Sequence, residues 1–207
     1  MPDMNWNTAA AATLENEHVL LRPIAEEHRA SLHRIALDPD IWEYFVSRVD
    51  TDEDYTAFFD TSLADQEAGR RVVFHITDKR TGRAAGSMSF GNMAEADRRL
   101  EIGWSWLGRE FRGRGVNRWA KLLMLRHAFE TLEAERVEFK TDILNERARR
   151  GLRNIGAVEE GTLRSFNYMP GGRRRDAIFY SVLRAEWPGV EERLLAGPKA
   201  ALATTAG

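Results

Sequence analysis

A strand, a glycine-containing loop and a long amphipathic helix follow one another between residues 99 and 132, and this unit constrains the fold most. The segment RLEIGWSWL (99–107) has the composition of a strand, and Gly113 and Gly115 follow it in a loop. The next segment places apolar residues every three or four positions along one stripe, at Val116, Trp119, Leu122, Leu125, Phe129 and Leu132. A stripe of this kind must be covered by a sheet or by another helix. The unit therefore predicts a sheet with helices packed on it.

The rest of the chain extends this pattern to a single α+β domain. Strands are predicted at 18–22, 71–78, 84–90, 99–107, 136–142, 160–168 and 177–184, and helices at 26–37, 51–67, 115–132 and 145–155. Helices between strands indicate a mixed sheet. The domain is expected to span residues 14–195, between a flexible arm over 1–13 and a flexible tail over 196–207.

Composition excludes several classes of function. The 207 residues contain no cysteine, so disulfides, thiolate metal sites and a cysteine acyl-enzyme are ruled out. The net charge of −2 offers no basic field for nucleic acid, and no apolar run approaches the roughly 20 residues of a membrane span. His28 and His33 are five residues apart, which does not fit a helical zinc pair. We expect a cytoplasmic protein without a metal, a nucleic-acid partner or a membrane.

The segment REFRGRGVNRWAK (109–121) is the strongest candidate for a binding site. Glycines allow the backbone to approach a ligand closely, and the free amides at a helix start attract negative charge. The segment is therefore interpreted as a pyrophosphate cradle, with a tight strand–helix turn as the plain alternative. A dinucleotide fingerprint requires a third glycine where this chain has Arg118, and the P-loop pattern is absent.

Five segments, in this order, resemble the GNAT N-acetyltransferases of the RimJ/RimL-type branch. They are LEIGWSWL, RGRGVN, HAFETL with RVEFKTD, NERARRGLRNIGAVEEGTLR, and RRDAIFYSVLRAEWP, and the resemblance covers about residues 18–195. It implies a splayed mixed sheet that receives the pantetheine arm of acetyl-CoA. The implied CoA-binding residues are Arg112, Gly113, Arg114, Gly115, Val116, Asn117 and Asn145, with Asn145 also a plausible helix cap. Asn117 and Ala148 depart from the family pattern, which usually has Gly or Ala and often Ser at these places.

The strand 99–107 also carries the candidate catalytic groups. Alternation places Leu100, Ile102, Trp104 and Trp106 on a core face and Glu101, Gly103, Ser105 and Leu107 on a cleft face, unless a bulge exchanges the faces midway. Glu101 is the candidate general base, with a structural ion pair to Arg99 or Arg136 as an equal alternative. A backbone amide at Trp106 or Leu107 is expected to stabilise the oxyanion. Tyr168, Tyr180 and Ser105 are candidates for protonating the leaving thiolate.

The acceptor is less well defined by the sequence. Trp42, Tyr44 and Phe45 stand where the family lines its acceptor pocket, with core packing an equal alternative, and His75 is a further candidate. The run Arg173–Arg174–Arg175 is interpreted as solvated charge, with contact to an acidic substrate or partner as the alternative. The predicted function is acetyl transfer from acetyl-CoA to a protein N-terminal amine or a small-molecule amine by direct attack. The alternative is a non-catalytic domain that binds or senses CoA, and a homodimer is left open.

Overall fold

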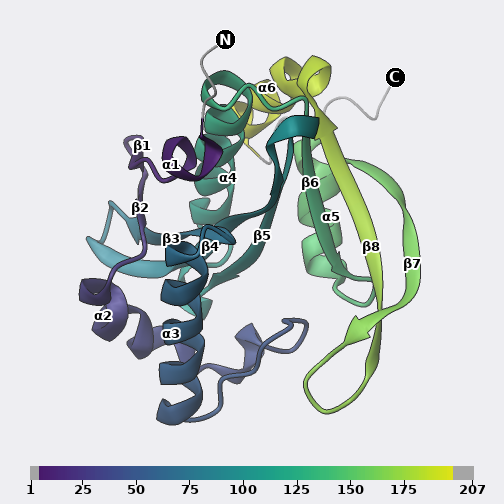
Figure 1. Cartoon of the computed structure of the whole chain (residues 1–207). Helices are drawn as coiled ribbons and strands as arrows, with labels where there is room; N and C mark the ends of the chain where they lie inside the picture. The colour runs from purple at the N-terminus through teal and green to yellow at the C-terminus, as the bar shows by residue number, and fades with distance from the viewer. Residues whose placement is uncertain (1–4, 198–207) are drawn as a thin grey trace.

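The structure, a computed structural model, describes residues 5–197 and contains one eight-stranded sheet (Figure 1). The strand order is β1-β2-β3-β4-β5-β6-β8-β7, and every neighbouring pair is antiparallel except β5 with β6. The strands are β1 (Leu14–Glu15), β2 (Val19–Pro23), β3 (Arg71–Asp78), β4 (Arg83–Ala94), β5 (Arg99–Leu107), β6 (Arg136–Asp142), β7 (Val158–Tyr168) and β8 (Arg174–Leu183). The predicted mixed sheet is confirmed, with β1 in addition.

Helices cover both faces of the sheet. They are α1 (Trp6–Ala10), α2 (Arg29–Ala36), α3 (Asp52–Glu67), α4 (Val116–Arg126), α5 (Glu146–Ile155) and α6 (Trp187–Ala196), and a π-helical turn at His127–Thr131 extends α4. The main core lies between the sheet and α1, α4, α5 and α6. A second core, built around Leu32, Trp42, Phe59 and Trp106, lies under α2 and α3 on the opposite face. None of the helices within residues 5–197 is long and apolar enough to cross a membrane.

The parallel pair β5–β6 separates after three residues. Arg99, Leu100 and Glu101 pair with Arg136, Val137 and Glu138, and no further pairs follow. Figure 1 shows the two strands diverging from this point, while β4 stays beside β5 and β8 stays beside β6. The sheet is therefore splayed, and Glu101 is the last residue of β5 that pairs with β6.

The start of the described chain corrects one expectation. The arm expected over 1–13 is ordered from Asn5 onward, because Asn5 caps α1 and Trp6 and Ala10 are buried in the main core. His127 is buried because α1 covers it, and its Nε2 lies 2.9 Å from the carbonyl oxygen of Ala9. Residues 1–4 and 198–207 of the predicted arm and tail lie outside the described residues.

Local sequence signals place several element ends correctly. Thr51 accepts from the amide of Asp54 and Asp54 accepts from the amide of Thr51, which forms a capping box at the start of α3. Gly156 ends α5 in the left-handed conformation, with φ of 93°. Helix α6 was not predicted, although Pro188 in its first turn is a residue typical of helix starts.

Candidate active site

A bulge in β5 determines which side chains face the splay. Ser87 of β4 pairs with Trp106 and Ser89 pairs with Gly103, so Trp104 and Ser105 lie together opposite Met88. Trp104 adopts a left-handed conformation with φ of 48°, which is costly for a bulky residue. An irregularity of this kind exchanges the two faces of a strand, because one extra residue breaks the alternation.

The simple alternation predicted for this strand holds at its start, and the bulge alternative is confirmed farther along. Leu100 and Ile102 belong to the main core as expected, whereas Trp106 is buried in the second core on the opposite face. Trp104 is not in either core. Its ring instead lies near the charged ends of Arg71 and Lys140, at 4.9 and 5.7 Å from its centre.

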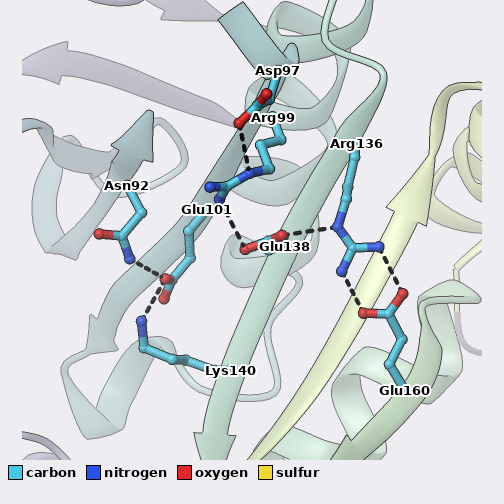
Figure 2. A network of polar contacts seen from close by, with 8 residues as sticks. All are labelled: Asn92, Asp97, Arg99, Glu101, Arg136, Glu138, Lys140 and Glu160. Atoms are coloured by element: carbon cyan, nitrogen blue, oxygen red, sulfur yellow. Dashed lines mark hydrogen bonds and ion pairs between the residues drawn. The ribbon is translucent and has the colours of Figure 1, made fainter. Parts of the chain in front are cut away.

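Glu101 is buried at the point where β5 and β6 separate, with 4% of its surface exposed. Its Oε2 accepts hydrogen bonds from Asn92 Nδ2 at 2.7 Å and from Lys140 Nζ at 2.6 Å (Figure 2). A Cβ added at Gly103 would lie 2.7 Å from Oε1, so the glycine makes room for this second oxygen. Both donors therefore hold one oxygen, and Oε1 is the atom left to accept a proton.

The ion-pair partner of Glu101 differs from the two expected alternatives. Arg99 lies near Glu138 at 3.9 Å, and Arg136 donates to Glu138 at 2.8 Å and to Glu160 at 2.6 Å. Figure 2 shows these pairs on the same face of the sheet as Glu101, with no dashed line that joins them to it. Lys140 is the partner instead, because β6 brings it alongside β5 on that face. Sequence spacing gave no signal for this long-range pair.

The glycine loop turns sharply before α4, where the cradle was predicted. Gly113 and Gly115 have φ of 73° and 87°, in the region that favours glycine, and nothing lies within 4 Å of a Cβ placed on Gly113. Helix α4 begins directly after Gly115, and Val116 is buried beneath the loop. The first amides of α4 therefore point outward without helical acceptors, as anion sites at helix starts require.

The arginines of the loop have different roles. Arg118 donates to the carbonyl of Leu194 at 2.5 Å and so closes the end of α6. Arg112 donates from Nε to the carbonyl of Leu107 at 3.1 Å. Burial lowers the pKa of Arg112, and the nearby charge of Arg147 lowers it further. Arg147, in the first turn of α5, was not among the predicted residues because its segment has the pattern of a solvated helix.

Two asparagines flank the opening between β5 and β6. The Oδ1 of Asn117 accepts from Lys121 Nζ at 2.9 Å, which directs this side chain along α4. Asn145 is the N-cap of α5, and its Oδ1 accepts from the amide of Ala148 at 3.0 Å. The cap uses only the oxygen of Asn145, so its Nδ2 can donate to a ligand at the same time.

The strand register selects one of the two candidate oxyanion donors. The amide of Gly108 donates to the carbonyl of Ala85 at 2.9 Å, toward β4. Successive amides of a strand point to opposite sides. The amide of Leu107 therefore faces away from β4, toward the side where β6 has diverged. The side chain of Trp106 is buried against Trp42 and can contribute to the site only through its backbone.

The three candidates for thiolate protonation lie in different places. Ser105 is exposed in the bulge of β5, where its Oγ donates to the carbonyl of Gly103 at 3.3 Å. Tyr180 is fully buried, and its hydroxyl donates to Glu159 at 2.8 Å. Tyr168 is 69% exposed at the end of β7, with Arg174 against its ring. Only Ser105 of these three belongs to the strand that lines the splay.

A cavity of about 510 Å³ opens on the face that carries Glu101. It lies between α3, the segment before it and the ends of β3, β4 and β5, and its lining includes Arg48, Asp54, Phe58, Asp65, Arg71, Asn92 and Trp104. Asn92 connects the cavity to Glu101 by its hydrogen bond. The cavity therefore opens beside Glu101.

The predicted acceptor residues Trp42, Tyr44 and Phe45 do not line this cavity. Trp42 is buried, and its Nε1 donates to the carbonyl of Ala36 at 2.7 Å, while its ring contacts Phe45 and Phe58. Phe58 lines the cavity and was not predicted. The pKa of Tyr44 is raised by the hydrogen bond from its hydroxyl to Glu43.

His75 lies away from the cavity, buried in a stack with His28. The two rings are 4.3 Å apart and 9° from parallel. Burial lowers the pKa of His75 to about 4, with smaller effects from His28 and Arg22. In residues 5–197 no group of three or more histidine, aspartate or glutamate side chains is placed to hold a metal ion.

Comparison with known proteins defines the class. Residues 18–158 match the acetyltransferase (GNAT) domain family, and the chain belongs to this family of N-acetyltransferases. The chain is 36% identical over 108 residues to the putative ribosomal N-acetyltransferase YdaF of Bacillus subtilis, a match that covers 52% of this chain and 58% of that relative. It is 27% identical over 178 residues to the uncharacterized N-acetyltransferase p20 of Bacillus licheniformis, covering 86% and 99%.

Solved structures give the same fold. A putative acetyltransferase from T. thermophilus is 39% identical, with a TM-score of 0.81 over 89% of this chain and 95% of that one. Mycobacterium smegmatis RimJ in complex with CoA-disulfide is 24% identical, with a TM-score of 0.75 over 91% and 95%. The splayed sheet predicted from the resemblance is therefore the fold of this family.

Proposed function

We propose that this protein transfers the acetyl group of acetyl-CoA to a primary amine in the splay between β5 and β6. The observation that carries the proposal is that pairing between these strands ends at Glu101, with the glycine loop at the other end of the opening. The splay leaves room for an extended arm, and the loop offers amides to phosphates. The structural similarity to a RimJ protein that binds CoA-disulfide supports this choice of donor.

Each residue along the splay has a separate role in the proposed reaction. The backbone of residues 112–117 holds the pyrophosphate, and Asn145 Nδ2 donates to the arm. The Leu107 amide donates to the thioester carbonyl oxygen, where negative charge develops. Glu101 Oε1 accepts a proton from the attacking amine, directly or through water. The amine nitrogen bonds to the carbonyl carbon and the carbon–sulfur bond breaks. The thiolate takes a proton from Ser105 Oγ, the predicted donor that lies on β5, and this exposed hydroxyl regains a proton from solvent.

A protein N-terminal amine is the favoured acceptor class. The support is the likeness to YdaF, whose name describes a putative ribosomal N-acetyltransferase. The open cavity beside Glu101 has room for several residues of an extended peptide. Small-molecule amines form the second class in the test.

The test incubates the protein with acetyl-CoA and a panel of peptides and small amines. Free CoA is followed with a thiol reagent, to which the chain adds no signal because it has no cysteine. Mass spectrometry identifies which amine gains an acetyl group. We expect CoA release that matches acetylated product for at least one amine. Binding of acetyl-CoA without release on any amine would instead indicate a CoA-binding or sensing domain.

A further inference from the structure

Arg175 is a buried guanidinium without a partner in the described part of the chain. It is 4% exposed, whereas Arg173 pairs with Asp142 and Arg174 donates to Ser165. None of the ion pairs within residues 5–197 includes Arg175, and its Nε is enclosed without an acceptor. Arginine remains charged in proteins, and buried charges are normally paired because desolvation is costly. A buried cation without a partner therefore points to a missing anion.

Strand β8 directs Arg175 to the face of the sheet that carries Glu101. Ile178, Tyr180 and Val182 enter the main core under the helices, so the odd-numbered residues of β8 face the other way. Phe179 pairs with Lys140, which reaches Glu101 on this same face (Figure 2). Helix α4, whose start forms the phosphate cradle, packs on the opposite face.

The charges around Arg175 do not balance. Burial has the largest effect on Arg175 and lowers its pKa. Asp142 and Glu101 lie near enough to act in the opposite direction, because they attract the charged guanidinium. Each carboxylate already has its own cation, since Asp142 pairs with Arg173 and Glu101 pairs with Lys140. Three cations thus face two carboxylates, and the charge of Arg175 is the one in excess.

We propose that Arg175 binds a carboxylate of the acceptor, so that the substrate class is amines that also carry an acidic group. The inference rests on the proposed function for the identity of the acceptor as an amine. The planar guanidinium fork matches a carboxylate with two parallel hydrogen bonds. The acceptor is the source of the anion because Arg175 lies on the face of Glu101 and the cavity, whereas the cradle for the donor phosphates lies on the face of α4.

The test compares Arg175→Met with the wild type and with Arg164→Gln. Methionine keeps length and removes the charge, and Arg164, exposed on β7, provides a matched loss of one charge. Calorimetry in the presence of CoA measures binding of two probe pairs, each with its C-terminal or α-carboxylate blocked as the amide so that only the side-chain carboxylates differ: Ala-Glu-Asp-Gly-Tyr-amide against Ala-Gln-Asn-Gly-Tyr-amide, and glutamate α-amide against glutamine α-amide. We expect at least one acidic probe to bind the wild type and Arg164→Gln at least tenfold more tightly than its amide. Arg175→Met should lose this preference, keep its CoA affinity and melt no lower than the wild type.

Three results would overturn the inference. The first is that neither acidic probe binds the wild type more tightly than its amide. The second is that Arg175→Met keeps the preference for the acidic probe. The third is that Arg175→Met loses CoA affinity, which would assign the arginine to the donor phosphates. The binding assay needs no turnover, so it separates the two proposals. If acidic probes bind through Arg175 but acetyl-CoA releases no CoA with any amine, the proposed function fails and the anion subsite remains.

Discussion

The stacked pair His28–His75 is expected to make the protein sensitive to acid. Both rings are buried between α2 and the sheet, with the Oγ of Ser31 3.4 Å from His75 Nε2. The amide of Ala25 donates to His28 Nδ1 at 3.0 Å, which keeps that nitrogen unprotonated in the fold. A proton on His75 would place a charge in an apolar region beside a second imidazole. The folded state therefore favours neutral His75.

The size of the effect follows from the two protonation states. The pKa of His75 falls from 6.5 in the unfolded chain to about 4 in the fold. A difference of about 2.5 pKa units corresponds to about 3 kcal/mol. Because the folded pKa is the lower one, this stability is present above about pH 6.5 and is lost as the pH falls toward 4.

Urea unfolding at about pH 7 and about pH 4.5 measures this loss. The comparison includes His75→Gln, because carboxylates elsewhere also titrate between these pH values and their contribution must be separated from that of His75. His33→Gln is the control, since it removes a partly exposed histidine that contacts Asp52. We expect wild type and His33→Gln to lose about 2–3 kcal/mol more free energy of unfolding than His75→Gln over this interval. Equal losses in all three proteins would refute the reasoning.

Two further predictions concern the CoA site. Gly115→Val places a branched residue at φ of 87°, which costs about 1–2 kcal/mol and obstructs the cradle. Calorimetry should therefore show acetyl-CoA binding that is at least about tenfold weaker. The control Gly151→Ala, at a glycine with open space around it, should bind acetyl-CoA normally. Asn145→Ala should raise the KM for acetyl-CoA and remove a helix cap worth about 1 kcal/mol; an unchanged KM with a lower melting temperature would show a cap alone.

Local patterns were sufficient for most of the fold. The bounds of β3, β5 and β6 agree with the predicted strands, because each is a short run of apolar and β-branched residues between turn signals. The cap of α5 was predicted from Asn145, since a side-chain cap acts within the first turn of the helix. The glycine loop was also predicted from the sequence, because its signal lies within a few neighbouring residues.

The parts that were missed depend on contacts between distant segments. A bulge in β5 was given only as an alternative, and its position at Trp104 depends on how β5 pairs with Ser87 and Ser89, since nothing within β5 itself fixes it. Lys140 meets Glu101 only because two strands 39 residues apart become neighbours. Arg175 appears in the sequence as one of three solvated arginines, and only the alternation of β8 shows that it is buried.

The pH dependence of kcat in the wild type and in Glu101→Gln tests the central claim most directly. Glutamine keeps the shape and the contact with Asn92 but cannot accept the proton. Base catalysis is typically worth about 10²–10⁴-fold. We predict that kcat falls at least about tenfold, that the acidic limb of the profile disappears, and that CoA affinity is nearly unchanged. A normal kcat with an unchanged profile and a lower melting temperature would show that Glu101 serves only as the ion-pair partner of Lys140.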